Sequence, residues 1–144
     1  MPIEDFLVGL QFITMLIMLF SVILIYKTIK SNERLNQKIL FTNITKEERE
    51  LKIKLNEYRD IIKKTNSEEA IFDYDSLLFN YYEYLAICVR KELIDEFDAK
   101  LYFKTILSSV KDRFENSLLF KENLVKKDEY LGIQWLFKRW NVEY

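Results

Sequence analysis

The residue types that usually carry enzymatic chemistry are scarce in this chain. It has no histidine, two glycines, one proline and a single cysteine, Cys88. Without histidine the chain lacks the commonest general base and the commonest metal ligand. Its sequence also has no glycine-rich phosphate loop and no Cys/His cluster of metal-ligand spacing. We therefore expect no enzymatic activity, no catalytic residue, no metal site and no cofactor.

The aromatic residues and the lone cysteine are better explained by core packing than by chemistry. Tyr81, Tyr82 and Tyr84 fall with Cys88 on the apolar side of an expected helix. The surrounding sequence is acidic, which disfavours the stacking of nucleic-acid bases on these rings. A reactive thiol needs an accessible, electropositive setting, whereas a thiol on a packing face is a small buried hydrophobe. We expect no nucleic-acid partner.

Three polar residues of the same expected helix form a possible partner or ligand surface. Asn80, Glu83 and Arg90 fall on one stripe, opposite the apolar rows. An arginine there could satisfy a carboxylate that a partner presents. The simpler interpretation is an ordinary solvated helix face, and the sequence leaves both interpretations open.

The chain begins with an apolar segment that precedes the helices expected to carry this surface. Residues 6–26 contain no charged side chain, and a helix of about 20 residues spans the hydrocarbon core of a bilayer, roughly 30 Å. A cleaved signal peptide would have a basic leader, a shorter apolar region and a small-residue cleavage site. This chain has an acidic leader, Glu4 and Asp5, and a long apolar region. We expect an uncleaved, single-pass transmembrane helix in the lipid bilayer.

Basic residues after the apolar segment predict its direction. Lys27, Lys30, Arg34 and Lys38 follow the span, while no lysine or arginine precedes it. Because basic flanks stay in the cytoplasm, we expect the N-terminus outside and the main domain inside, at the inner (cytoplasmic) membrane. The four basic side chains could also contact anionic lipid heads at the membrane surface. A merely solvated helix is an equally good interpretation.

A polar stripe runs along the apolar segment. Gln11, Thr14, Met18 and Ser21 recur at spacings of three and four, which places them on one helix face. A glutamine in hydrocarbon prefers a polar partner, and another copy of the same helix can supply one. We predict a homo-oligomer through this stripe, with a pore as a less favoured alternative. The other interpretation is that these side chains only bond to their own backbone.

The remaining chain predicts an all-α fold, because tight turns between strands require more glycine and proline than this chain has. We divide it into an N-terminal tail and transmembrane helix (1–26), a basic juxtamembrane stalk (27–44) and a small cytoplasmic helical bundle (45–144). Helices are expected from a capping box at Thr45 to residue 64, from Asp73 or Asp75 to about Glu92, from a cap at Asp95 onward, and over 128–141. The apolar seam of the first favours bundle packing over a coiled coil between copies; its residues are Ile44, Leu51, Leu55, Tyr58 and Ile62.

The stretch over residues 77–96, LLFNYYEYLAICVRKELIDE, resembles a bacterial helical family known as a domain of unknown function, the four-seven-six-zero group. The matching positions are Leu78, Asn80, Glu83, Ala86, Ile94, Asp95 and Glu96, and residues 130–140 also look similar. Family members often carry glycine where this chain has Glu92. The resemblance implies a membrane-anchored helical protein with a role in phage defence, and it brings no functional residue with it.

Three functional hypotheses follow from the sequence. The first is a membrane-anchored interaction or effector module, clustered at the membrane by a ligand or a protein partner and acting in antiphage defence. The second is a passive membrane adaptor or inhibitor that recruits a protein partner. The third is a receptor for a nucleotide-type signal, which would use basic residues such as Arg90, Lys91, Arg113, Lys138 and Arg139.

Overall fold

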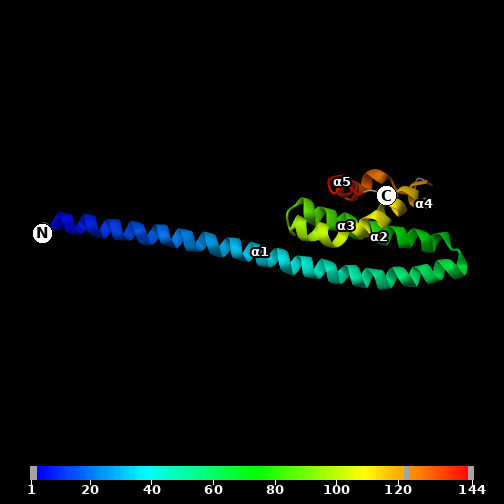
Figure 1. Ribbon diagram of the computed structural model, residues 1–144, viewed down its shortest axis with the longest axis horizontal. Helices are drawn as coiled ribbons and strands as arrows, with labels where there is room; N and C mark the ends of the chain where they lie inside the picture. Colours follow the sequence, from blue (N-terminus) through cyan, green and yellow to red (C-terminus); the bar gives the residue numbers. More distant parts are fainter. Residues whose placement is uncertain (1–2, 122–123, 143–144) are drawn as a thin grey trace. The chain divides into compact units, whose positions relative to one another are not determined.

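The computed structural model describes residues 3–121 and 124–142, and this part of the chain is helical without a strand (Figure 1). The prediction of an all-α fold is confirmed. In chain order the elements are α1 (Ile3–Thr65), α2 (Glu68–Arg90), α3 (Glu96–Asn116), α4 (Leu118–Lys121), a 3-10 helix η1 (Lys127–Tyr130) and α5 (Leu131–Arg139).

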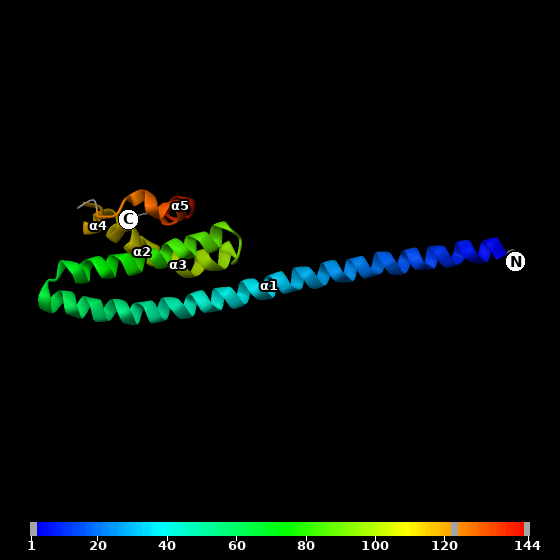
Figure 2. The same cartoon turned by 180° about the vertical axis from the view of Figure 1, so that it is seen from behind.

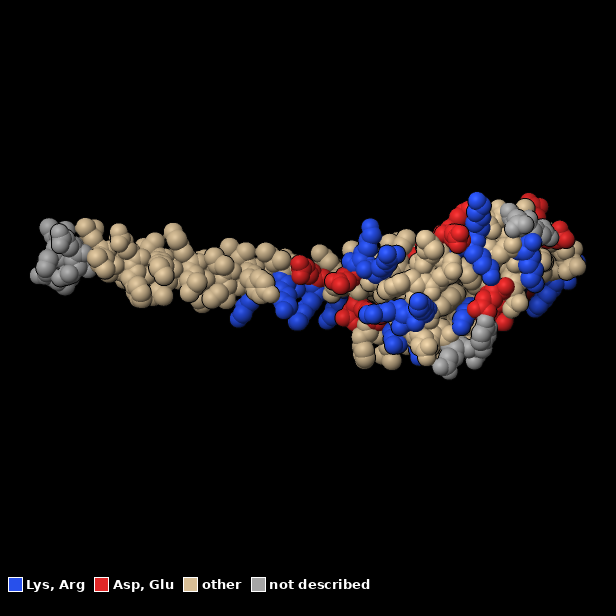
Figure 3. Space-filling view, turned by 90° about the horizontal axis from the view of Figure 1, so that it is seen from above, with Lys and Arg blue, Asp and Glu red and all other residues tan. Residues whose placement is uncertain are grey.

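The chain divides into two compact units, Met1–Asn36 and Gln37–Tyr144. The first is the apolar start of α1, in which every side chain from residue 7 to residue 36 is exposed. Among the described residues, this is the one helix long and apolar enough to cross a membrane, by length and composition. Figure 3 shows the uncharged stretch, followed by the first lysine and arginine side chains.

The second unit is a bundle arranged around α2. In Figures 1 and 2, α2 runs back alongside the last part of α1, and the short C-terminal helices lie beyond it. Helix α2 contacts α3, α4, η1 and α5. Large apolar side chains from all the long elements of this unit form one core; among them are Ile44, Leu55, Phe79, Tyr82, Leu85, Phe103, Leu107, Ile133, Leu136 and Trp140. Burial of this surface is the main favourable contribution to folding.

The seam residues in the last part of α1 follow the predicted packing. Ile44, Leu51 and Leu55 are buried in the core, and Tyr58 and Ile62 pack partly against it. The predicted helix start at Thr45 is wrong, because α1 runs through this position. The Thr45 hydroxyl donates to the Thr42 carbonyl (2.9 Å) within the helix. No glycine or proline lies nearby to end the helix.

Helix α2 begins earlier than predicted. Its N-cap is Ser67, whose Oγ accepts from the Ala70 amide (3.3 Å), so that Asp73 and Asp75 lie inside the helix. The predicted cap at Asp95 is confirmed, since its carboxylate accepts from the Asp98 amide (3.0 Å). The last predicted helix is present as η1 followed by α5.

The turns use left-handed backbone at residues other than glycine. Asn66, Glu92 and Asn141 have φ of 48°, 56° and 47°. Asparagine tolerates this region better than most residues, whereas glutamate does not. Glu92 is therefore the strained position of the turn between α2 and α3.

Candidate functional site

A crevice of about 860 Å³ lies between α1 and α3, with α2 as its floor. Its floor and walls are largely apolar, while its rims carry polar and charged side chains. Residues at four successive turns of α1 border it: Lys52, Asn56, Arg59 and Lys63. All of its lining residues belong to the second unit. This volume falls in the range of about 300–1,000 Å³ that is typical of small-molecule sites.

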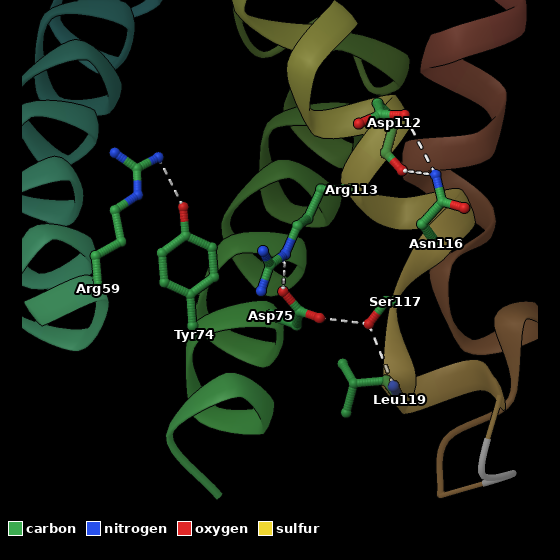
Figure 4. A network of polar contacts seen from close by, with 8 residues as sticks. All are labelled: Arg59, Tyr74, Asp75, Asp112, Arg113, Asn116, Ser117 and Leu119. Carbon is green, nitrogen blue, oxygen red and sulfur yellow. Dashed lines mark hydrogen bonds and ion pairs between the residues drawn. The ribbon is translucent and has the colours of Figure 1, made fainter. Parts of the chain in front are cut away.

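Two arginines meet at one tyrosine ring in this crevice. In Figure 4, Arg59 of α1 and Arg113 of α3 reach toward Tyr74 of α2. The guanidinium carbon of Arg113 lies 4.7 Å from the ring centroid, and that of Arg59 lies 5.7 Å from it. Nη2 of Arg59 also donates to the Tyr74 hydroxyl (3.0 Å). Both guanidinium groups are thus oriented by the same aromatic side chain.

A buried carboxylate holds one of these arginines. Nε of Arg113 donates to Oδ1 of Asp75 (2.6 Å), and the Ser117 hydroxyl donates to Oδ2 (Figure 4). The Leu119 amide in turn donates to Oγ of Ser117 (3.2 Å). The Asp75 side chain is almost wholly buried, so its charge requires this partner. The network ties the first part of α2 to the junction of α3 and α4.

The charges around the crevice leave a positive surplus on the α1 side. Lys52 pairs with Glu48 (2.7 Å between Nζ and Oε1), and Arg113 pairs with Asp75. In the described part of the chain, Arg59 and Lys63 form no ion pair. Arginine donors are well matched to carboxylate and phosphate oxygens. The crevice can therefore bind an anionic group near the Tyr74 ring.

Glu48 closes the crevice at the other end. Its side chain is 1% exposed, and among the described residues its Oε2 has no hydrogen-bond partner. Its charge adds to the effect of burial in raising the pKa of the Tyr82 hydroxyl. Although it is charged, Glu48 lies inside the packed face of α1, between the buried residues Ile44 and Leu51.

The structure places Asn80 and Arg90 in a different setting from Glu83. Asn80 and Arg90 are exposed on α2. Both Glu83 oxygens accept from backbone amides at the start of α5, from Gly132 (2.8 Å) and Ile133 (2.7 Å). The structure thus assigns Glu83 an internal role as the N-terminal cap of another helix.

The other predicted positions are distributed as follows. Lys27, Lys30, Arg34 and Lys38 are exposed on α1. Arg139 is engaged with Glu96 through Nε and Nη2 (3.0 Å each). Of the basic residues considered for a nucleotide-type signal, only Arg113 lines the crevice.

The polar stripe of the first unit is largely satisfied by its own helix. The Thr14 hydroxyl donates to the Leu10 carbonyl, and the Ser21 hydroxyl donates to the Ile17 carbonyl (2.8 Å each). Gln11 makes no such bond within the described residues. Of the polar groups in the stripe, the Gln11 amide is the one still available to a partner helix.

Burial explains the aromatic and thiol groups of α2. Tyr82 and Cys88 are buried, and the Tyr81 hydroxyl donates to the Ile44 carbonyl (2.8 Å). Burial raises the pKa of the Cys88 thiol, which disfavours the reactive thiolate. Tyr84 is more exposed than its place in the apolar row predicted.

Arg59, Tyr74 and Asp75 were not identified as site residues from the sequence. Asp75 was predicted as a possible helix cap, whereas its partner Arg113 lies on α3. Arg59 of α1 likewise has its partner, Tyr74, on another helix. The described residues contain no group of three or more acidic, histidine or cysteine side chains that could hold a metal ion.

The chain matches no protein-family model, no curated protein and no solved structure. The family resemblance of residues 77–96 therefore stays a prediction.

Proposed function

We propose that this protein is a membrane-anchored helical interaction module whose crevice binds an anionic group of a partner. The observation that carries the proposal is the pair of guanidinium groups, Arg59 and Arg113, at the Tyr74 ring. Of these two arginines, only Arg113 has a carboxylate partner among the described residues. The donors that remain are suited to a carboxylate of a protein partner or to a phosphate.

The uncharged, exposed side chains of residues 7–26 support the membrane anchor. In water this surface would be unfavourable, whereas in a bilayer it replaces lipid contacts at little cost. The basic residues that follow support an inward-facing domain. The test is extraction of cell membranes at alkaline pH, together with a fluorescent reporter fused to the C-terminus. We expect the chain to stay in the membrane pellet and the reporter to lie in the cytoplasm.

The crevice is tested by titrating the full chain, in detergent micelles, with an oligoglutamate peptide and separately with inorganic pyrophosphate. A ligand that binds only the folded state raises its melting temperature. We expect stabilisation of the wild type that weakens in high salt and is lost in Arg59→Gln. The matched control is Lys54→Gln, which removes one charge from an exposed site of α1 outside the crevice. Equal stabilisation of both variants would overturn the proposal.

A receptor for a nucleotide-type signal is the second candidate. The volume of the crevice and the exposure of cations beside an aromatic ring favour it. Adenosine diphosphate would then bind more tightly than pyrophosphate, because its base and sugar add contacts. If pyrophosphate and adenosine diphosphate bind equally, or only the peptide binds, the nucleotide receptor is excluded.

Clustering in the membrane would proceed through Gln11. Since the Thr14 and Ser21 hydroxyls bond to their own helix, the contact between copies depends on the glutamine amide. We expect Gln11→Leu to lower the extent of crosslinked oligomers in membranes, and Thr14→Ala/Ser21→Ala to leave it unchanged. Unchanged crosslinking of all variants would remove the stripe from the mechanism.

Two readouts separate an active effector from a passive adaptor. An effector changes the membrane potential of the host when the partner is present, whereas an adaptor or inhibitor only recruits it. A role in antiphage defence is supported by the resemblance of residues 77–96 alone. We expect phage plaque counts to fall in cells that express the wild type and to recover with Arg59→Gln.

A further inference from the structure

Three large apolar side chains are exposed around the start of α3. Leu93 is 48% exposed, Phe97 is 73% exposed and Leu101 is 76% exposed. Phe97 and Leu101 are the two most exposed large apolar side chains in the described part of the chain. Single exposed apolar residues are ordinary, but Phe97 and Leu101 lie four residues apart on one face of α3, and Leu93 is exposed in the turn that leads directly into this helix. We refer to Leu93, Phe97 and Leu101 as the α3 patch.

The fold holds this patch outward. In the turn before α3, the Leu93 amide donates to the Cys88 carbonyl (2.9 Å), and Ile94 is buried in the core. Farther along α3, the rings of Tyr102 and Phe103 meet Phe41 of α1 edge to face. The core side of α3 is therefore fully used by packing. The patch lies on a side of the helix for which the second unit supplies no cover.

The patch also lies at the end of the second unit where the chain arrives from the apolar segment. The side-chain amide of Gln37, the first residue of this unit, donates to the Glu92 carbonyl (3.0 Å). Glu92 directly precedes Leu93 in the turn. Only the ten residues 27–36 separate Gln37 from the apolar segment. Those ten residues span about 15 Å as a helix and at most about 35 Å when extended.

We infer that the α3 patch inserts into the headgroup region of the bilayer and gives the domain a second membrane contact. The inference rests on the proposed membrane anchor. The headgroup layer is itself about 5–8 Å thick on each side, so the helical tether of about 15 Å brings the patch to this layer when the helix is tilted toward the bilayer surface. Because the membrane anchor already holds the domain at the bilayer, contact of the α3 patch with lipid is intramolecular. A small apolar surface is then enough to form this contact. Leucine and phenylalanine are suitable side chains for such interfacial insertion.

The charges near the patch indicate what drives the contact. Residues 90–104 carry four basic and four acidic side chains, so they have no net attraction for anionic lipid. Two of the acidic groups are used within the fold: Asp95 caps α3, and Glu96 accepts from Arg139 and Trp140. Insertion of the apolar side chains therefore drives the contact, and attraction between charges adds little to it. The contact should form on neutral lipid and persist in high salt.

The experiment uses the full chain carrying Phe97→Trp, reconstituted in phosphatidylcholine vesicles whose acyl chains are brominated close to the headgroup. Bromine quenches tryptophan emission only at short range. The control is Leu124→Trp, at a residue that is 56% exposed and borders Glu68 and Glu69 at the start of α2. It lies at the opposite end of α2 from the patch, about 35 Å away along that helix. The wild type, with Trp135 and Trp140, supplies the background emission.

We expect Phe97→Trp to gain emission that is shifted to shorter wavelength and quenched by the brominated lipid, in low and high salt alike. Leu124→Trp should gain emission that is not quenched.

Vesicle flotation separates the proposed membrane anchor from the proposed membrane contact of the α3 patch. If the chain floats but the two variants are quenched equally, the anchor stands and the patch inference is overturned. If the blue shift of Phe97→Trp disappears on dilution into excess lipid, a second copy covers the patch and the inference is also overturned. A chain that fails to float overturns the anchor, and with it this inference.

Discussion

At the scale of single residues, the cap formed by Glu83 links two helices that are far apart in the sequence. Both carboxylate oxygens accept amides at the start of α5, where the helix leaves amides unpaired. A Cβ on Gly132 would lie 2.5 Å from Oε1 of Glu83. The close approach of the carboxylate, and not φ, which is not positive, therefore favours glycine here, because a side chain at residue 132 would push the end of Glu83 away from the two amides.

This geometry predicts that Gly132→Ala changes the free energy of unfolding in one direction in the wild type and not in that direction in the Glu83→Ala variant. Gly132→Ala should destabilise the wild type by roughly 1–3 kcal/mol, because the carboxylate must move away. Glu83→Ala should also cost roughly 1–3 kcal/mol, since it leaves two amides unpaired. In the Glu83→Ala background, Gly132→Ala should become neutral or stabilising, because alanine favours a helix and the clash is gone. Urea unfolding of the full chain in micelles measures the cycle, and additive effects would contradict it.

Protonation of the Glu96 carboxylate lowers the stability of the fold when the pH becomes acidic. The hydrogen bond from Arg139, and to a lesser extent that from Trp140, lowers the pKa of the Glu96 carboxyl below its ordinary value of 4.5. Because the folded pKa is lowered, the stabilisation is complete above the ordinary value and is lost as pH falls through the lowered one. We expect the melting temperature of Glu96→Gln to fall less than that of the wild type between neutral pH and pH values below 4.5. Glu57→Gln, at an exposed residue of α1, should behave as the wild type does.

At the scale of elements, the turn between α2 and α3 decides where the exposed patch and the core residue Ile94 lie. Glu92 holds φ at 56°, where a side chain is unfavourable by roughly 1–2 kcal/mol. Glu92→Gly should therefore stabilise the fold by about 1 kcal/mol, net of the entropy that glycine loses on folding. Lys91→Gly, at φ −91°, is the control and should destabilise it instead. Equal changes in the unfolding free energy would show that the left-handed residue is not strained.

At the scale of the whole molecule, the boundary between the two units lies at Gln37. The residues between it and Thr45 belong to the bundle, since Ile44 is buried and its carbonyl accepts from Tyr81. Phe41 packs on Tyr102 and Phe103. A domain cut at residue 45 would lose all of these contacts.

Two truncations test this boundary. A chain that begins at Gln37 should be soluble and should unfold cooperatively, because it keeps the whole core. A chain that begins at Thr45 should be less stable by roughly 2–5 kcal/mol, since removing one large buried side chain such as Ile44 already costs this much. Circular dichroism during thermal unfolding measures both. Equal stability of the two chains would place the start of the folded domain at the end of the basic stalk, after residue 44, and not at Gln37.

The sequence by itself determined the features that depend on neighbours along the chain. The shortage of glycine and proline indicated helices, and the uncharged run over residues 6–26 indicated an apolar helix. The Asp95 cap and the buried seam of Ile44, Leu51 and Leu55 follow from spacing within a few turns of one helix. Local rules also failed where two local signals competed. Thr45 fits a capping box, but nothing around it breaks the helix, so α1 continues.

Only the tertiary structure decided which polar residues act together. Glu83 reaches amides 49 and 50 residues away, and Arg113 meets Asp75 across 38 residues. Tyr74 lies between cations supplied by two other helices. Helical periodicity places a residue on a face but does not give the rotation of that face against its neighbours. The packing of the core sets that rotation, and with it the crevice, the cap of α5 and the exposed α3 patch.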